Sequence, residues 1–355
     1  PWPRAHAADV KIAHLLFTHS FAGTERHAIE LANAQAQSHE VTMLLHRRAA
    51  QQRDTALAHR LDARVHVQLL SGWRPLLLWR ARRALRALRP DVAHAHLSNA
   101  CRALHGQRGL CLRVATLHIR YKPQQHADMD ALIAIAPWQL AEVPAAQRGH
   151  TTQIDNWTGP YEPAADARAR LRREWGVAEH DYLIGALGRS EHSKGLDVLI
   201  RAFEQARPSG ARLVIVGHGR DWQRLRALAG PDIVMPGFVA RPQDCFAAFD
   251  TFVSAARSEP FGLVFLEAMA AGLPILATAS QGGQHFAAQI GRPLVPVEDV
   301  AALQAALLRL AAQRAPRQAY AMAAFDRDAR VAQVEQVYRR GIAELHRGAA
   351  AAAPP

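Results

Sequence analysis

Long hydrophobic runs are absent, since no apolar stretch reaches the roughly 18–20 residues that a membrane-spanning helix needs. Cysteine is scarce as well: Cys101, Cys111 and Cys245 form no CxxC pair and cannot build a disulfide framework. The first four residues, Pro-Trp-Pro-Arg, lack the basic-then-apolar layout of a secretory signal. These absences exclude the disulfide-stapled and integral-membrane classes, and we expect a cytoplasmic protein.

Acidic residues are fewer than basic ones, 31 against 43, which gives a net charge of +12. Residues 1–160 contain 20 Lys and Arg against 11 Asp and Glu, whereas residues 161–355 contain 23 against 20. This asymmetry favours an anionic partner, such as nucleic acid, a phosphorylated substrate or an acidic membrane surface. An arginine-rich genome composition would produce the same excess.

The length of 355 residues predicts about two domains, at roughly 150 residues for each. Short aliphatic runs alternate with longer amphipathic segments, which is typical of βα units on a parallel sheet. The expected strands are residues 11–17, 40–46, 65–70, 92–96, 113–118, 131–135, 183–187, 212–216, 233–235, 251–255, 274–278 and 293–297. The expected helices are residues 24–38, 76–89, 97–107, 195–206, 221–229, 263–271, 300–312 and 327–346.

This alternation favours an α/β fold with two Rossmann-like doubly wound domains, over residues 1–158 and 174–326. A Gly/Pro-containing stretch, residues 157–173, is the expected linker. A final helix is expected over residues 327–346, and one option is that it crosses back to the first domain. Ligands of such folds bind where the carboxyl ends of the strands face a crevice.

The densest motif is residues 258–274, SEPFGLVFLEAMAAGLP. An expected strand leads into a loop with Glu259, and a helix begins near Gly262, where free backbone N–H groups and the helix dipole favour a phosphate. Glu267 lies eight residues after Glu259, at most about 12 Å along the axis, which is comparable to a nucleotide sugar from ribose to hexose. The alternative is two carboxylates on a solvated helix start.

A second motif, GRSEHSKG, follows the first strand of the second half. Its Arg189 and Lys194 are suited to converge on a diphosphate, the arginine as a fork and the lysine as a point charge. Glycines also follow neighbouring strands, where they let the backbone approach a ligand closely; they are Gly188, Gly217 and Gly237, the last followed by Phe238. Together these loops predict a phosphate-binding edge on one domain.

With these motifs the second half resembles the retaining GT-B-fold glycosyltransferases of family 4 (group 1), whose hallmark is a Glu, seven residues, and a second Glu. In the first half, residues 23–27 (GTERH), 90–96 (PDVAHAH) and 116–118 (TLH), together with Asn156, match further family motifs. The resemblance covers nearly the whole chain. It implies two domains that face each other across a cleft.

The resemblance also implies roles for individual residues. Arg189 and Lys194 would hold the donor diphosphate, Glu267 the donor ribose, and Glu259 a hydroxyl of the transferred sugar. His118 would face the donor sugar from the other domain. The full expected donor-binding set is Gly23, Gly188, Arg189, Lys194, Gly217, Gly237, Phe238, Glu259, Phe261, Gly262, Leu263 and Glu267, and the expected catalytic set is His118, Glu259, Arg189 and Lys194.

The activity implied is that of a retaining, metal-independent hexosyltransferase, which moves a sugar from a UDP- or GDP-type nucleotide sugar to a lipid-linked or cell-envelope saccharide. No cofactor is implied beyond this substrate. The alternatives are an epimerase or a phosphorylase on the same fold and, less favoured, a basic nucleic-acid-binding module. Four positions depart from the family pattern, namely Ala22, Ala136, Trp157 and Phe286.

Two possible metal signals are weaker. Asp128–Asp130 and Asp326–Asp328 spell DxD, but the first leads into a strand and the second starts a helix. His94 and His96 alternate on a short strand and could bind zinc with a third residue, although core histidines fit this position better. We therefore expect no metal.

The segment from Arg74 to Arg89 is a strongly basic amphipathic helix. One face has the apolar side chains, and the other has Trp79 with Arg80, Arg82, Arg83, Arg86 and Arg89. A crossover helix with a solvated polar face is one reading. The other is peripheral contact with anionic lipid at the inner face of the cytoplasmic membrane.

Overall fold

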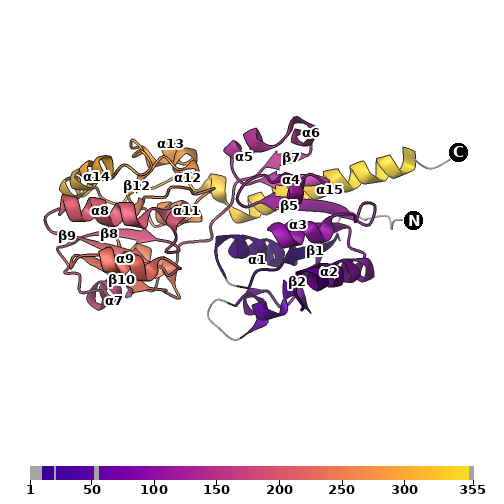
Figure 1. Cartoon of the computed structure of the whole chain (residues 1–355), viewed down its shortest axis with the longest axis horizontal. Helices are drawn as coiled ribbons and strands as arrows, with labels where there is room; N and C mark the ends of the chain where they lie inside the picture. The colour runs from indigo at the N-terminus through magenta and orange to yellow at the C-terminus, as the bar shows by residue number, and fades with distance from the viewer. Residues whose placement is uncertain (1–9, 20, 52–55, 352–355) are drawn as a thin grey trace. The chain divides into compact units, whose positions relative to one another are not determined.

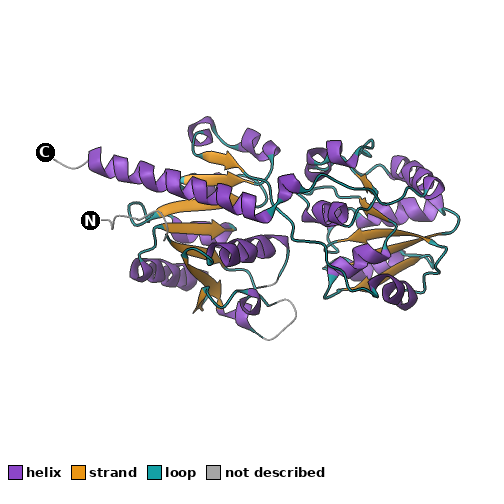
Figure 2. Ribbon diagram, turned by 180° about the vertical axis from the view of Figure 1, so that it is seen from behind, coloured by secondary structure: helices purple, strands orange, loops and turns teal. Residues whose placement is uncertain are grey.

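The computed structural model describes residues 10–19, 21–51 and 56–351, with side chains to residue 347. The prediction about residues 1–4 lies outside this range. The chain forms two compact units: unit 1 consists of Pro1–Trp157 with Arg327–Pro355, and unit 2 of Thr158–Asp326. In each unit, helices cover both faces of a central sheet (Figures 1 and 2).

Unit 1 is built on a seven-stranded parallel sheet in the order β3-β2-β1-β4-β5-β6-β7. Its strands are β1 (Lys11–Leu16), β2 (Glu40–His46), β3 (His66–Leu70), β4 (Val92–His96), β5 (Leu112–Leu117), β6 (Ala131–Ala134) and β7 (Thr151–Gln153). Its helices are α1 (Gly23–Gln35), α2 (Arg74–Leu88), α3 (Ser98–Leu104), α4 (Pro123–His126), α5 (Pro137–Glu142), α6 (Ala145–Arg148) and α15 (Arg327–Ala351). This strand order is that of a doubly wound Rossmann-type sheet.

The sequence analysis missed β7, since Thr151-Thr152-Gln153 is short, polar and only half-buried. It pairs with β6 at the end of the sheet. A three-residue polar strand has no apolar pattern that sequence could reveal, because its pairing is set by its neighbour.

Helix α15 is part of the core of unit 1, although it comes last in the chain (Figure 1). Val334, Val337 and Tyr338 are buried with residues of the sheet. At Gly341 a Cβ atom would lie 2.6 Å from Leu112 Cδ1, so the helix packs very close to β5 there. Close packing of this kind requires the small residue.

Unit 2 is built on a five-stranded parallel sheet in the order β10-β9-β8-β11-β12. Its strands are β8 (Tyr182–Leu187), β9 (Ala211–Val216), β10 (Ile233–Gly237), β11 (Thr251–Ser254) and β12 (Ile275–Ala277). Its helices are α7 (Ala167–Glu174), α8 (Leu196–Ala206), α9 (Trp222–Leu228), α10 (Pro242–Ala248), α11 (Leu263–Ala270), α12 (Gln281–His285), α13 (Ala287–Ile290) and α14 (Val300–Gln313).

Two segments of unit 2 differ from expectation. Residues 293–297 were predicted to be a strand, but only a single bridge between Thr278 and Val295 forms there. Residues 158–173, which we treated as linker, belong to unit 2. Within them α7 is anchored by the buried Arg172, whose guanidinium donates to Asp250 Oδ2 at 3.2 Å and to Asp181 O at 2.7 Å.

The α/β class and the two parallel doubly wound sheets are thus confirmed. Among the described residues, no helix combines the length and the apolar character that crossing a bilayer would demand. Because all strands within a sheet run parallel, each unit gathers the loops after its strands at a single edge, where ligands of such folds bind.

Candidate active site

Three glycines bring the ends of neighbouring strands of unit 2 together. A Cβ atom at Gly217, after β9, would lie 1.9 Å from the carbonyl oxygen of Gly188, after β8. The amide of Gly217 donates to the carbonyl of Gly237, at the end of β10, at 2.8 Å. Any side chain at Gly217 would push these ends apart, and its φ of +125° is also one that favours glycine.

Lys194 and Glu259 meet beside the start of α11. The Lys194 ammonium lies 2.5 Å from Glu259 Oε2, and both side chains are largely buried. Gly262 has a φ of +90°, and a Cβ atom there would lie 2.5 Å from Phe265 Cδ2 and 3.0 Å from Glu259 Cγ. No described side chain caps α11. The Phe265 amide donates to the Gly262 carbonyl at 2.8 Å, which leaves the Leu263 and Val264 amides of the first turn to an anion.

Arg257 ties the two loops of this site to each other, and the sequence analysis missed it. Its guanidinium donates to both oxygens of Asp197 at 2.7 and 3.0 Å and to the carbonyl of His192 at 2.9 Å. Its own amide donates to the carbonyl of Ser193 at 2.9 Å. These bonds hold the turn that carries Lys194 against the loop that carries Glu259. They also lower the pKa of the Asp197 carboxyl.

Glu259 is fixed from its other side by α12, a contact that the sequence analysis also missed. The Glu259 amide donates to Gln281 Oε1 at 3.2 Å, and the Gly282 amide donates to the Glu259 carbonyl at 2.7 Å. A Cβ atom at Gly282 would lie 2.3 Å from the carbonyl oxygen of Phe261. The only sequence signal is the Gly282-Gly283 pair, which resembles an ordinary turn.

The other expected donor residues of unit 2 lie as follows. Arg189 is 64% exposed and forms an ion pair with Glu191 at 3.3 Å. Phe238 is also exposed, at 54%. No described contact joins Arg189 or Phe238 to the Lys194–Glu259 pair. Glu267 is half-buried in α11, and Leu263 begins that helix.

Phe261 is part of an aromatic cluster in the interior of unit 2. Its ring lies 5.2 Å from that of Phe286 and 5.3 Å from that of His285. Phe286 is fully buried and also contacts Phe265. Phe286, one of the four departures from the family pattern, is therefore part of the packed interior of unit 2. Since the Phe261 side chain is buried as well, only its backbone remains to meet a ligand.

In unit 1, Gly23 is the exposed first residue of α1, and Ala22 before it has no side chain that could cap the helix. His118 directly follows β5 and is almost fully buried. Its Nε2 lies 3.0 Å from Nδ1 of His96. Burial lowers the pKa of His118 to about 3, so its imidazole is neutral near pH 7.

The structure brings a third histidine, His14, to the pair considered for zinc. One ring nitrogen from each of His14, His94 and His96 lies within 4.8 Å of the others. All six ring nitrogens of these residues, however, already have hydrogen-bond partners in the protein, among them Thr116 and Tyr338 for His94. The three rings are therefore members of a hydrogen-bonded network.

The first DxD motif serves another purpose in the fold. Asp128 and Asp130 accept hydrogen bonds from the buried guanidinium of Arg113, at 2.9 and 2.6 Å. Two carboxylates that neutralise one buried cation are what such a charge needs to remain in the interior. Asp328, in the second DxD motif, pairs with Arg327 in the first turn of α15.

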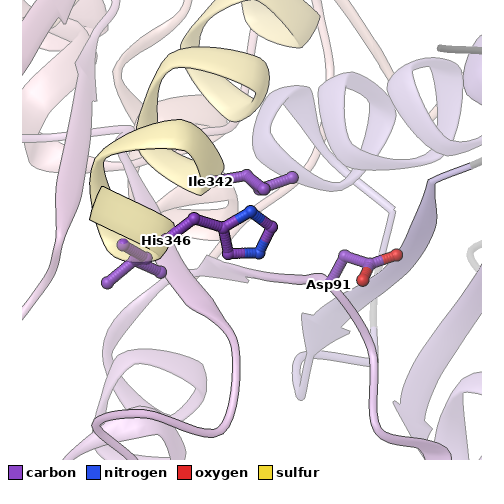
Figure 3. A pocket seen from close by; sticks show the side chains of 4 residues that line it. Asp91, Ile342 and His346 are labelled. Carbon is purple, nitrogen blue, oxygen red and sulfur yellow. The ribbon is translucent and has the colours of Figure 1, made fainter. Parts of the chain in front are cut away.

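Two hollows lie elsewhere. In unit 1, a cavity of about 10 Å³ is lined by Asp91, Ile342, Leu345 and His346, and it has room for about one water (Figure 3). The Asp91 carboxylate accepts from the Lys11 amide at 2.8 Å, so this motif residue joins the start of β4 to the start of β1.

In unit 2, an open hollow of about 450 Å³ is lined by residues that include Tyr161, Arg168, Asp250 and Arg317. None of the expected donor residues lines it.

Both units match known family models. Residues 181–313 match "Glycosyl transferases group 1", and residues 21–152 match "Glycosyltransferase Family 4". The "Lipopolysaccharide core biosynthesis glycosyltransferase LpsE" of Rhizobium meliloti is 28% identical over 286 residues, which cover 78% of this chain and 81% of that protein. A "GDP-mannose-dependent monoacylated alpha-(1-6)-phosphatidylinositol monomannoside mannosyltransferase" of Corynebacterium glutamicum is 30% identical over 203 residues, covering 52% of this chain and 53% of that protein.

Among solved structures, Anabaena Alr3699/HepE in complex with UDP and glucose has a TM-score of 0.72 at 19% identity, with 96% of this chain and all of that chain covered. Together with the two parallel sheets, these matches define a glycosyltransferase of the GT-B fold. The chain belongs to the group 1 glycosyltransferases, family 4.

Proposed function

We propose that unit 2 binds a nucleotide-diphosphate sugar and that the enzyme transfers its hexose with retention of anomeric configuration. The observation that carries this proposal is the Lys194–Glu259 pair beside the uncapped start of α11. A cation and free helix amides suit a diphosphate, and a carboxylate beside them suits a sugar hydroxyl.

In the proposed reaction, a hydroxyl oxygen of the acceptor forms a bond to the anomeric carbon on the face from which the diphosphate leaves. The bond from that carbon to the phosphate oxygen breaks, and the hydroxyl proton passes to an oxygen of the leaving diphosphate. Lys194, with Arg189, offsets the charge that grows on this leaving group. Glu259 binds a hydroxyl of the transferred sugar, and Glu267 binds the donor ribose. No metal or cofactor takes part.

The proposed acceptor is a lipid-linked or cell-envelope saccharide. This choice is supported by the names of relatives, which act in lipopolysaccharide core and phosphatidylinositol mannoside synthesis. UDP- and GDP-sugars are the donors to test first, since UDP is bound in the Anabaena structure and GDP-mannose is named for the Corynebacterium enzyme.

We further propose that β3 and α2 contact anionic lipid from the cytoplasmic side. Four of the eight large exposed apolar side chains of the described chain lie in this stretch: Val67, Leu69, Trp73 and Trp79. Arg83 and Arg86 of α2, and Arg89 directly after it, are also exposed, and the Arg83 guanidinium carbon lies 5.7 Å from the ring centre of Trp79. Apolar anchors among arginines are typical of a helix that lies on a lipid surface.

Not all arginines of α2 belong to this surface. Arg80 donates to the carbonyl of Ser71 at 2.6 Å, and Arg82 donates to the carbonyls of Arg102 and Ala103 at 3.0 and 3.2 Å. These two guanidinium groups therefore hold the helix on unit 1. The proposed lipid contact rests on Trp73 and Trp79 and on the three exposed arginines.

The decisive experiment measures heat of binding and product formation with a panel of UDP-, GDP-, ADP- and TDP-sugars and candidate glycolipid acceptors. We expect one nucleotide class to bind, a glycoside with the donor's anomeric configuration by NMR, and full activity in EDTA. A product with inverted anomeric configuration would contradict retention. Loss of activity in EDTA would contradict metal independence. An isomerised donor would favour the epimerase alternative, and a sugar phosphate would favour the phosphorylase alternative.

A further inference from the structure

A chain of buried imidazoles runs through unit 1 to His118. Gln35 Oε1 lies 2.8 Å from His14 Nε2, His14 Nδ1 lies 3.1 Å from His96 Nε2, and His96 Nδ1 lies 3.0 Å from His118 Nε2. Gln35, His14 and His96 are completely buried. The residues come from α1, β1 and β4, and the chain ends just after β5, at the edge where ligands of such folds bind.

Burial makes every ring of this chain neutral. It lowers the pKa of His14 to about 4 and that of His96 well below its usual range, as it does for His118. A neutral imidazole has one N–H donor and one acceptor nitrogen. Each ring between two hydrogen-bond partners must therefore donate on one side and accept on the other.

The direction of the chain is set at Gln35. An amide oxygen can only accept, so His14 Nε2 carries the hydrogen and His14 Nδ1 is an acceptor. His96 must then donate from Nε2 and accept at Nδ1, and His118 must donate from Nε2. This leaves Nδ1 of His118 as an acceptor, and no other described side chain hydrogen-bonds to it.

We propose that Gln35, His14 and His96 are positioning residues that lock His118 in the Nε2–H form and so present its Nδ1 as an acceptor to a hydroxyl of the substrate. The substrate contact in this inference rests on the proposed function. The tautomer of His118 does not, because it follows from hydrogen bonds within unit 1. A substrate group that could only accept would be disfavoured here, because two acceptors would face each other. The chain thus selects a hydroxyl over a carbonyl or a phosphate oxygen at this point.

The tautomers are measured on the unliganded protein with ¹⁵N-labelled histidine, by NMR shifts and couplings that distinguish Nδ1–H from Nε2–H. We expect Nε2–H for His14, His96 and His118. An Nδ1–H form of His96 or His118 would overturn the proposal. So would zinc retained by the purified protein, since a metal between His14 Nδ1 and His96 Nε2 would replace the proton.

Variants link the tautomer to function. Gln35→Met removes the terminal acceptor and should give a mixture of His118 tautomers and a donor KM raised about tenfold, the cost of one directed hydrogen bond. Gln35→Glu keeps an oxygen acceptor and should restore the Nε2–H form and the KM. Thr116→Val, which removes a partner of His94 outside the chain, is the matched control and should change neither.

These readouts separate two kinds of failure. If no donor binds the wild-type enzyme, the proposed function fails, while the tautomers of the unliganded protein still test the chain. If Gln35→Met shifts the tautomer of His118 but leaves the KM unchanged, the substrate contact is overturned. If Gln35→Met unfolds unit 1, Gln35→Glu alone decides, because a change to Nδ1–H in that variant would contradict the proposed direction.

Discussion

The ammonium of Lys194 and the carboxylate of Glu259 lie 2.5 Å apart, although 65 residues separate them in the chain. One follows β8 and the other follows β11, two strands that are neighbours in the sheet of unit 2. The pair therefore joins the loops that follow two neighbouring strands. In the proposed reaction, Lys194 is also the group that meets the growing charge on the leaving diphosphate.

Lys194→Ala should lower kcat by about 100-fold or more, because it removes a preorganised cation from a developing charge. Glu259→Gln keeps the size of the side chain and removes its charge, and it should also lower turnover. Both are measured as initial rates with the donor identified in the panel. Lys122→Ala removes an exposed lysine of unit 1 and should stay within about twofold of wild type. Wild-type turnover in Lys194→Ala would reject the assignment.

Arg257→Met should destabilise unit 2 by about 2 kcal/mol, since it leaves the partly buried Asp197 carboxylate without its paired bonds. The control is Arg201→Met, because Arg201 faces the same carboxylate at 3.8 Å but is 54% exposed. It should cost no more than about 0.5 kcal/mol. Urea unfolding of both variants gives the comparison, and equal losses would show that Arg257 has no special role.

Acid should destabilise unit 1 well above the range in which carboxylates titrate. Burial lowers the pKa of His14 and His126 to about 4 and that of His118 to about 3, from 6.5. Above pH 6.5 these histidines are neutral in both the folded and the unfolded chain, so their burial does not reduce the free energy of unfolding. Below that pH the unfolded chain binds more protons than the folded one, and each histidine then costs about 1.4 kcal/mol per pH unit.

This dependence is measured as the Tm between pH 7.5 and pH 5.5, which we expect to fall. His126→Asn keeps an acceptor for the Lys122 amide and removes one titrating group, so it should reduce the slope by one histidine's share. A Tm that is constant over this range would show that these rings are not buried in the neutral form.

Trp79→Ala and the pair Arg83→Glu with Arg86→Glu should each weaken binding to vesicles that contain acidic lipid. Each exposed arginine contributes about 1 kcal/mol near such a surface, so the charge-reversed pair should lose binding about 10-fold or more. The matched control, Arg173→Glu with Arg309→Glu, changes the same charge at exposed positions of unit 2. Binding that is absent in wild type, or that does not depend on salt, would contradict the lipid contact.

Gly341→Val should destabilise unit 1 by about 1–3 kcal/mol, because its side chain would enter the space of Leu112 beneath α15. Ala343→Val also introduces a β-branched side chain into α15, but at an exposed position where it meets no clash. It should cost only a few tenths of a kcal/mol. Thermal unfolding separates the two. Similar melting temperatures would mean that α15 can shift away from β5.

The sequence by itself determined the βα alternation and most strands of both sheets, and it pointed to the loops that carry Lys194 and Glu259, because buried parallel strands and glycine-rich turns leave a local pattern. It did not reveal β7 or α7, whose residues acquire their structure from a neighbouring strand and from the Asp250 carboxylate. A polar segment without an apolar period has no local signal.

Only the tertiary structure decided how the chemistry-bearing residues are held. Arg257 and Gln281 look like ordinary surface residues in the sequence, yet they fix the loops of Lys194 and Glu259. His14 lies 80 residues from His94 in the chain and opposite it in the sheet. Hydrogen bonds between side chains from different strands depend on strand order and register, and these are set by the packing of the whole unit.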